Sequence, residues 1–359
     1  MNIDVSRHRV AVACLALLVI SNEFNAPSAA RADEPLLRFQ QSQPHMGTRF
    51  VFTLYAANAQ QAGKALSAVA RRIEAIEQRM SDYRPDSEIR RLGHRAAAWP
   101  PAETPQEPLP TQPISDELRT VLTESRRVGE RSCGAFDISI APLSELWRIS
   151  RRTGAMPDPA AHRRARECVG PSHWSLTPGG VVMNPGVRFD LGGIAKGYAL
   201  DESIRVLREH GIQSALVDGG GDLAASDPPP GRDAWRIGVA PLQADGRPEW
   251  VLALARAAVA TSGDAWQFVT IDGRRYSHVI DPQTGWGVEG RHSATVYAPT
   301  GIAADAWASA LCVLGPQRGI KLLQTEPGAE AIVTTLVDGA PQQSQSAGFS
   351  RVAQRREPR

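Results

Sequence analysis

The segment over residues 190–198 (DLGGIAKGY) places a glycine pair directly before a predicted helix. Glycines at such a position let backbone N–H and C=O groups approach a ligand closely, and the first turn of a helix favours anions such as phosphates. Lys196 adds a positive charge in that first turn. Spacing alone leaves a structural turn and a ligand-binding loop equally open.

A second glycine-rich segment covers residues 217–222 (VDGGGD), directly after a predicted strand. Three consecutive glycines cost backbone entropy, so either a ligand approaches the backbone there or the turn is very tight. The segment matches neither the dinucleotide-binding fingerprint nor the phosphate-loop pattern. Both interpretations therefore stay open.

A histidine stands at the end of a predicted strand in residues 277–285 (SHVIDPQTG). The imidazole of His278 titrates near neutral pH, which suits removal of a proton from a hydroxyl group. Asp281, three residues further on, could orient that imidazole or accept a proton itself. An isolated histidine is more often structural, but the nearby carboxylate of Asp281 favours a functional role for His278.

A carboxylate and a hydroxyl are four residues apart in residues 304–311 (ADAWASAL), as Asp305 and Ser309. On a helix these two side chains share one face. Oxygen ligands of this kind suit a hard cation such as Mg²⁺ rather than zinc or copper. Taken alone, a capping aspartate and a small packed serine explain this segment better.

The predicted elements around these segments mix strands and helices without strict alternation. Apolar residues recur at steps of three and four over residues 62–80, which predicts a helix with one buried face. Further helices are predicted over 116–129 and over 195–210, the latter ending at Gly211. The other expected elements are strands near 50–54, 215–217, 235–239, 250–254 and 294–297, a helical pair over 304–314 and 317–324, and a surface loop over 100–113. This mixture favours an α+β fold over a doubly wound sheet.

The first 32 residues are typical of a cleavable secretory signal. A positively charged start precedes an apolar run over residues 10–20, and a small-residue site precedes Asp33. The run is about half of the roughly 20 residues that span a bilayer, although an uncleaved membrane anchor is the alternative. We therefore expect an exported, periplasmic protein that is soluble after signal cleavage.

The rest of the chain is predicted to form one large domain over residues 33–340, followed by a polar, disordered tail over 341–359. The formal net charge is +2, from 40 basic and 38 acidic residues. This charge is too small to produce the strong positive potential that is typical of nucleic-acid-binding proteins. Cys133, Cys168 and Cys312 remain after cleavage, and their spacing matches neither a disulfide framework nor a metal site.

Six motifs occur together and in a fixed order over about residues 43–331: MGT from Met46, MSDY from Met80, GAFD from Gly134, DLGGIAKGYALD from Asp190, TSGD from Thr261 and HVIDPQTG from His278. In this combination the chain resembles the ApbE-type FAD:protein FMN transferases. The resemblance implies a T-fold-like α+β flavin-binding domain that takes FAD as its substrate and uses Mg²⁺. It also implies transfer of FMN to a threonine or serine hydroxyl of a partner protein, with AMP leaving. Membrane-bound electron-transfer subunits are among the candidate partners.

The resemblance also implies roles for individual residues. The implied FAD contacts are Met46, Tyr83, Ala135, Phe136, Asp137, Asp190, Lys196 and Ile280. The implied metal ligands are Gly193 through its carbonyl, Asp305 and Ser309, with Ala308 as a further ligand. His278 would help to deprotonate the acceptor hydroxyl, with Asp281 beside it.

The chain departs from the family pattern at three positions. Ser309 stands where threonine is usual, Asp218 stands where asparagine is common, and Gly93 replaces a frequent asparagine. Two other functions remain as alternatives: a metal-dependent FAD pyrophosphatase, in which water replaces the hydroxyl, and a non-catalytic protein that binds or scavenges flavin. The presence of His278, Asp305 and Ser309 argues against the non-catalytic alternative.

Overall fold

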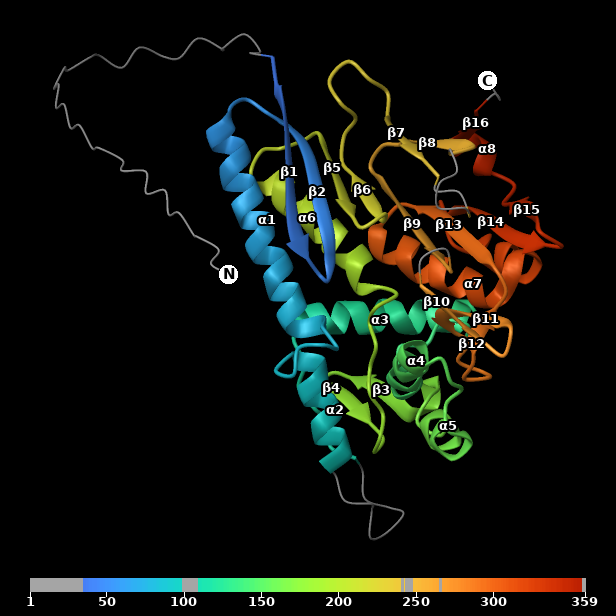
Figure 1. Ribbon diagram of the computed structural model, residues 1–359. Helices are drawn as coiled ribbons and strands as arrows, with labels where there is room; N and C mark the ends of the chain where they lie inside the picture. The colour runs from blue at the N-terminus through green and yellow to red at the C-terminus, as the bar shows by residue number, and fades with distance from the viewer. Residues whose placement is uncertain (1–34, 99–108, 240–241, 243–247, 265–266, 357–359) are drawn as a thin grey trace, which may run out of the picture. The chain divides into compact units, whose positions relative to one another are not determined.

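The computed structural model describes residues 35–98, 109–239, 242, 248–264 and 267–356 (Figure 1). They form the predicted α+β fold, built on an eight-stranded sheet in the order β1-β2-β5-β6-β9-β13-β14-β15. All neighbouring strands in this sheet run antiparallel, and it ends at β1 and β15 without closing into a barrel. The strands are β1 (Leu37–His45), β2 (Thr48–Ala56), β5 (Ala215–Gly219), β6 (Leu223–Ala225), β9 (Ala257–Gly263), β13 (His292–Ala298), β14 (Glu330–Val337) and β15 (Ala340–Gln345).

The predicted strand near residue 50 is β2, whose alternating Phe50, Phe52 and Leu54 are almost completely buried. A two-residue turn joins β1 to β2, since His45 pairs with Thr48. Met46 and Gly47 in this turn have φ angles of 50° and 70°. Positive φ at both central positions is what a type I′ turn requires, and its twist matches that of the flanking strands.

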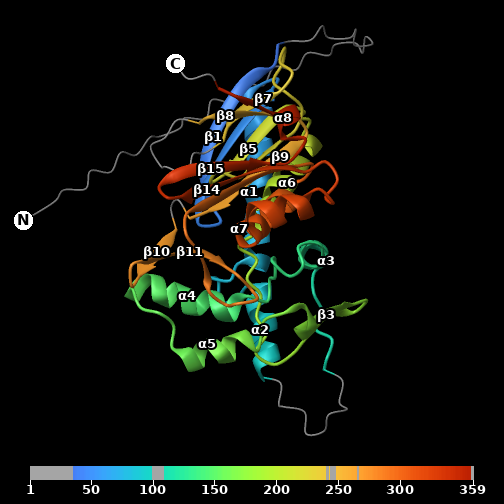
Figure 2. The ribbon, with the colours of Figure 1, turned by 90° about the vertical axis from the view of Figure 1, so that its right-hand side faces the viewer.

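Three helices pack side by side against the eight-stranded sheet: α1 (Ala59–Met80), α6 (Ala195–Glu209) and α7 (Gly301–Leu323) (Figures 1 and 2). The periodic apolar residues of α1 form its buried face, as predicted. The predicted C-terminal helical pair is α7, where Gly315 with a φ of 70° and Pro316 break the regular helix. These helices carry several side chains of the site described below.

The backbones of α6 and α7 are in direct contact near the N-terminal ends of the two helices. A Cβ atom on Gly197 would lie 2.1 Å from the carbonyl oxygen of Gly301, so no larger residue fits between the helices. The carboxylate of Asp201 on α6 accepts hydrogen bonds from the backbone N–H groups of Gly301 and Ile302, at 2.6 and 2.9 Å. Asp201 therefore caps the start of α7 and fixes it against α6.

A second group of elements lies beyond one end of the sheet, at the lower end of Figures 1 and 2. Only α3 among its helices was predicted from the sequence. The group contains α2 (Glu88–Ala98), α3 (Asp116–Arg131), α4 (Ala141–Thr153), α5 (Pro159–Arg166), the short 3-10 helix η1 (Pro171–His173), β3 (Trp174–Thr177) and β4 (Gly180–Met183).

Two three-stranded sheets complete the described structure. One contains β10 (Phe268–Ile271), β11 (Arg274–Ile280) and β12 (Gly287–Glu289). The other contains β7 (Trp235–Gly238), β8 (Trp250–Leu254) and β16 (Ala353–Arg355). Of the strands in these two sheets, β7 and β8 were predicted, and β11 ends close to His278 as expected.

The expected disorder of the C-terminal tail is wrong over residues 341–356. This stretch contains most of β15, the helical turn α8 (Phe349–Val352) and β16. Phe349 is completely buried and meets Trp250 edge to face, with ring centroids 5.5 Å apart. One aromatic anchor and backbone pairing to other strands order the tail, and neither produces a periodic apolar pattern.

Other predictions fall partly or wholly outside the described residues. The predicted signal over residues 1–32 and residues 100–108 of the predicted loop lie there. In the described end of that loop, Gln112 is buried and forms an isolated bridge with Val181. Within the described part of the chain, no helix is both long and apolar enough to cross a membrane.

Candidate functional site

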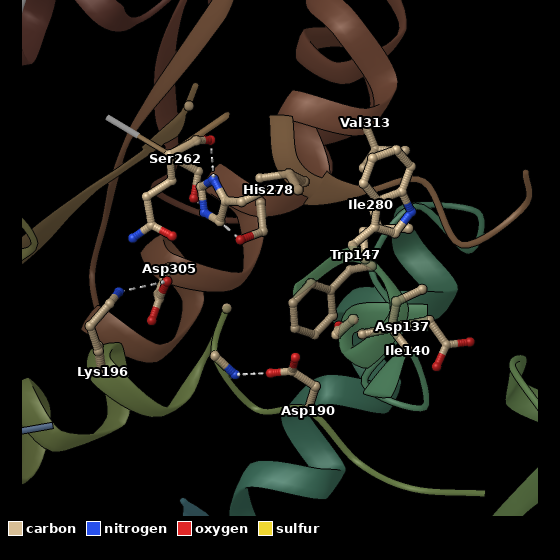
Figure 3. Close-up of a pocket in the computed structure, with 18 of the residues that line it drawn as sticks. Asp137, Ile140, Trp147, Asp190, Lys196, Ser262, His278, Ile280, Asp305 and Val313 are labelled. Atoms are coloured by element: carbon tan, nitrogen blue, oxygen red, sulfur yellow. Dashed lines mark hydrogen bonds and ion pairs between the residues drawn. The ribbon is translucent and has the colours of Figure 1, made fainter. Parts of the chain in front are cut away.

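A cavity of about 450 Å³ gathers most of the residues predicted from the motifs (Figure 3). In Figure 3, Lys196, Asp305, His278 and Ser262 lie on one side and apolar residues such as Ile280 lie on the other. The predicted residues that line it are Tyr83, Ala135, Phe136, Asp137, Asp190, Gly193, Lys196, His278, Ile280, Asp305 and Ser309. We refer to it as the first cavity.

Three predicted site residues, all described, are not among those that line the first cavity. Met46 lies in the β1–β2 turn, where its backbone N–H donates to the carboxylate of Glu77. Ala308 is completely buried in the core on α7. Asp281 accepts a hydrogen bond from the N–H of Gln283 at 2.9 Å, so its carboxylate organises the turn after β11.

Lys196 lies between two buried carboxylates, those of Asp222 and Asp305. Its Nζ forms an ion pair with Asp222 and is 3.5 Å from Oδ1 of Asp305. Burial opposes the charge on Lys196, but the two carboxylates outweigh burial and raise the pKa of the ammonium group. Burial raises the pKa of Asp305 to about 6, while Lys196 favours its ionised form.

Backbone groups fix both of these carboxylates in place. Asp222 accepts a hydrogen bond from the N–H of Thr261 at 3.0 Å, and Asp305 accepts one from the N–H of Gly197 at 3.0 Å. Sequence reasoning included Asp222 in the glycine-rich segment but gave it no role. Its neighbour Asp218 instead accepts from the N–H of Gly221 at 2.8 Å and does not line the first cavity.

Ser309, Gly193 and Ser262 line the same cavity as Asp305. A Cβ atom on Gly193 would lie 2.8 Å from Oγ of Ser309, so the two residues are in direct contact. Oγ of Ser309 lies 3.2 Å from Oγ of Ser262, which belongs to the TSGD motif. No cluster of three or more His, Cys, Asp or Glu side chains suited to a metal occurs among the described residues. A cation here would depend on mixed carboxylate, hydroxyl and carbonyl oxygens, a donor set that suits Mg²⁺.

The imidazole of His278 is oriented by a backbone carbonyl. Its Nδ1 lies 3.2 Å from the carbonyl oxygen of Gln267, which can only accept a hydrogen bond. The proton therefore resides on Nδ1, and Nε2 keeps a lone pair for a base. Burial lowers the pKa of His278 from 6.5, against the opposing effect of that hydrogen bond, so the ring is neutral near pH 7.

The orienting role considered for Asp281 is not observed, since the partner of the His278 ring is the carbonyl of Gln267. The alternation of β11 explains the difference. His278 and Ile280 are two residues apart, point the same way and both line the first cavity. Asp281 follows the strand end, where its carboxylate is engaged in the turn.

Arg148 on α4 is a cavity residue that sequence reasoning missed. It forms ion pairs with Asp82 and, at 3.1 Å, with Asp190. Its guanidinium carbon also lies 4.6 Å from the ring centroid of Tyr83, whose side chain is largely exposed. Burial and the neighbouring Asp190 raise the pKa of Asp82. No spacing in the sequence links α4 to these three residues.

The GAFD motif forms the wall next to Gly193. Phe136 is buried, and a Cβ atom on Gly193 would lie 3.3 Å from its ring. The carboxylate of Asp137 accepts hydrogen bonds from the N–H and the hydroxyl of Ser139, at 2.8 and 2.6 Å. Burial raises the pKa of Asp137 despite these two bonds. Phe136 therefore packs against the glycine turn, while Asp137 orders its own loop.

Comparisons with known proteins identify the family to which the chain belongs. The model of the family described as "ApbE family" matches residues 46–333. FAD:protein FMN transferase from Salmonella typhimurium is 29% identical and aligns over 78% of this chain and 80% of its own length. The protein with that name from Treponema pallidum is 31% identical, over 75% of this chain and 76% of its own.

The fold is also similar to solved structures. Flavin transferase ApbE from Vibrio cholerae superposes with a TM-score of 0.76 at 26% identity, covering 89% of this chain and all of that one. The apo form of the flavinyl transferase ApbE from Pseudomonas stutzeri also has a TM-score of 0.76 at 26% identity, over 89% and 98% of the two chains.

Proposed function

The chain belongs to the ApbE family, and on that premise we propose that it transfers FMN from FAD to a threonine or serine hydroxyl of a partner protein. The transfer would require Mg²⁺ and release AMP. The observation that carries this proposal is the arrangement in the first cavity. A neutral histidine, whose Nε2 has no hydrogen-bond partner among the described residues, lies in the same cavity as a lysine, two carboxylates and a glycine turn before a helix.

The two sides of the first cavity suit the two chemical parts of FAD. Apolar residues, among them Ile140, Trp147, Ile280 and Val313, lie opposite Lys196 and Asp305 and would pack against the flat flavin ring (Figure 3). The pyrophosphate would lie near Lys196 in the first turn of α6, where the ammonium group and the helix dipole favour an anion.

Asp305, Ser309 and the carbonyl of Gly193 are the residues that would hold Mg²⁺. All three residues line the first cavity, and Asp305 and Ser309 are one helical turn apart on α7. Oxygen donors of these kinds are the ligands that Mg²⁺ prefers. When bound, the metal supplies positive charge against the pyrophosphate and the departing AMP. Lys196 contributes a second positive charge from the protein itself.

His278 would act as the general base for the acceptor hydroxyl. The hydroxyl oxygen attacks the phosphorus on the FMN side of the pyrophosphate, and its proton passes to Nε2 of His278. The bond between that phosphorus and the bridging oxygen breaks, and AMP leaves with the bridging oxygen. A hydroxyl is a weak nucleophile at its ordinary pKa, so a positioned base raises its reactivity.

The pH dependence of transfer is expected to follow the protonation of His278. Because only the neutral imidazole can accept the proton, kcat/KM rises with pH through the pKa of His278 and then levels off. Burial, with Arg151 and Lys196 nearby, lowers that pKa from 6.5, while Gln267 and Asp190 oppose the shift. The plateau should therefore begin at a lower pH than for an ordinary histidine. Measuring kcat/KM between pH 4.5 and 8 follows this rise. An inflection above pH 6.5 would contradict the lowered pKa of His278.

The decisive experiment combines the purified protein with FAD, Mg²⁺ and a partner protein that bears an acceptor threonine. A fluorescent covalent FMN adduct, formed together with one AMP per adduct, is the expected result. Release of AMP without an adduct would favour an FAD pyrophosphatase. Bound FAD without AMP release would overturn both enzymatic functions and favour flavin binding alone.

We also propose that the protein acts outside the cytoplasm, in the periplasm, on an acceptor in the same compartment, such as a membrane-bound electron-transfer subunit. The charged start, the short apolar run and the small-residue site in residues 1–32 support this location. N-terminal sequencing of the protein from a cell fraction tests it, with Asp33 expected as the first residue. An intact Met1 in the cytoplasmic fraction would contradict it.

A further inference from the structure

A second cavity, of about 500 Å³, lies beside the first. The helices α2, α4 and α5 and the segment before Asp190 contribute its walls. Four arginines line it, namely Arg90, Arg148, Arg164 and Arg188, and we call it the arginine cavity. Arg148 and Asp82 line both cavities. The proposed FMN transfer uses neither the arginine cavity nor its other arginines.

The arginine cavity carries an excess of positive charge. Only two carboxylates, Asp82 and Glu145, line it beside the four guanidinium groups. Asp82 pairs with Arg148, and Glu145 is shared by Arg188 at 2.7 Å and Arg90 at 3.4 Å. Arg164 has no acidic partner among the described residues. The formal excess of two charges matches a phosphate dianion, which guanidinium groups bind through paired hydrogen bonds.

Part of the lining of this cavity is apolar. Ile89, Leu146, Ile149 and Phe189 contribute to it, and the side chain of Ile149 is exposed. Cavities that bind small molecules commonly combine an apolar lining with a few converging polar groups. This apolar part of the lining therefore favours a ligand that has an apolar body in addition to its charge.

Gly93 makes room for one of the arginines. A Cβ atom on Gly93 would lie 3.0 Å from Cγ of Arg188, so the aliphatic part of Arg188 lies directly on the α2 backbone. The absence of a side chain at Gly93 therefore leaves room for an arginine that lines the arginine cavity.

We propose that the arginine cavity is a binding site for an organic phosphomonoester, distinct from the site of FMN transfer. Arg164 and Arg188 bind the phosphate dianion, and Leu146 and Ile149 contact the apolar body. The proposal stands independently of FMN transfer, because it requires only that the described cavity binds a ligand of this chemistry.

The test is a calorimetric titration of the purified protein with phenyl phosphate, which has both the charge and the apolar body. Inorganic phosphate and phenol each lack one of these features and should bind more weakly. Arg164→Ala and Arg188→Ala should each raise the Kd for phenyl phosphate about tenfold or more, because each removes a charge-assisted hydrogen bond. Arg163→Ala, an exposed arginine on the same helix that does not line the cavity, is the matched control and should leave the Kd unchanged.

Gly93→Ala adds only a methyl group and should weaken binding by displacing Arg188, without any change of charge. Unaltered FAD affinity and circular dichroism in all variants would show that they fold. Titrations with and without FAD locate the ligand, since phenyl phosphate should bind at one site in both conditions. Loss of that binding on addition of FAD would place it in the first cavity and overturn the proposal. A Kd that is unchanged in Arg164→Ala and Arg188→Ala, or no binding to the wild type, would also overturn it.

Discussion

Replacing His278 by alanine is expected to lower the rate of FMN transfer by about 10²- to 10⁴-fold, the usual contribution of a general base. FAD affinity should change little, because the charged groups of the first cavity and its apolar side remain in place. The rate is measured from the fluorescence of the covalent FMN adduct on a denaturing gel. FAD affinity is measured separately, from quenching of protein fluorescence without added metal.

His210→Ala is the matched control for this experiment. The Nδ1 of His210 also lies within hydrogen-bonding distance of a backbone carbonyl, that of Val206 at 2.9 Å, but His210 does not line the first cavity. Its replacement should leave transfer unchanged, whereas His278→Ala should also lose the acidic limb of the pH profile. Full transfer by His278→Ala would remove this residue from the mechanism. A parallel loss of FAD affinity would instead assign it a binding role.

Replacing Lys196 by methionine is expected to destabilise the metal-free protein by about 3 kcal/mol, since removal of one partner of a buried ion pair leaves an uncompensated charge. Asp222 and Asp305 are 5% and 2% exposed, and the methionine would leave both without their shared cation. Urea denaturation in the presence of a chelator measures the free energy of unfolding. FMN transfer should fall as well, because a positive charge near the pyrophosphate is lost.

Mg²⁺ provides a second readout for the Lys196 variant. A ligand that binds only the folded state raises its stability. Mg²⁺ should therefore raise the melting temperature of Lys196→Met more than that of the wild type, because the carboxylates are free of the ammonium. Lys64→Met, an exposed lysine on α1, is the control and should change stability little. A metal-free stability equal to that of the wild type would show that Lys196 does not neutralise these carboxylates.

The elements that sequence patterns predicted best are those with one strongly apolar face. The helix α1 buries Val69, Ile73 and Ile76 at helical spacing, and β2 buries alternate residues, so local periodicity was sufficient. The helices α4 and α5 were missed although each has proline in its first turn. Buried residues of both helices pack in one small satellite cluster rather than in the main core, and the apolar pattern of each helix is short.

The site was predicted to a similar extent and for similar reasons. Motifs identified residues whose chemistry is local, such as the glycine turn before α6 and the histidine at the end of β11. Arg148 was missed and Asp222 received no role, because each acquires its significance from a partner far away in the chain. Asp281 was given a role beside His278 from sequence proximity alone, yet the strand end turns its carboxylate toward Gln283.

By itself, the sequence determined the α+β class, the order of the motifs and the kinds of groups available for chemistry, because residue type and short-range spacing carry that information. The tertiary structure alone decided which of these groups meet. It placed Lys196 between Asp222 and Asp305 and the ring of His278 within hydrogen-bonding distance of the Gln267 carbonyl. It also brought four arginines together in a second cavity. The physical reason is that charge pairing and burial depend on distances across packed elements. Those distances are set when α6 and α7 cross at Gly197 and when the helices beyond the sheet pack together.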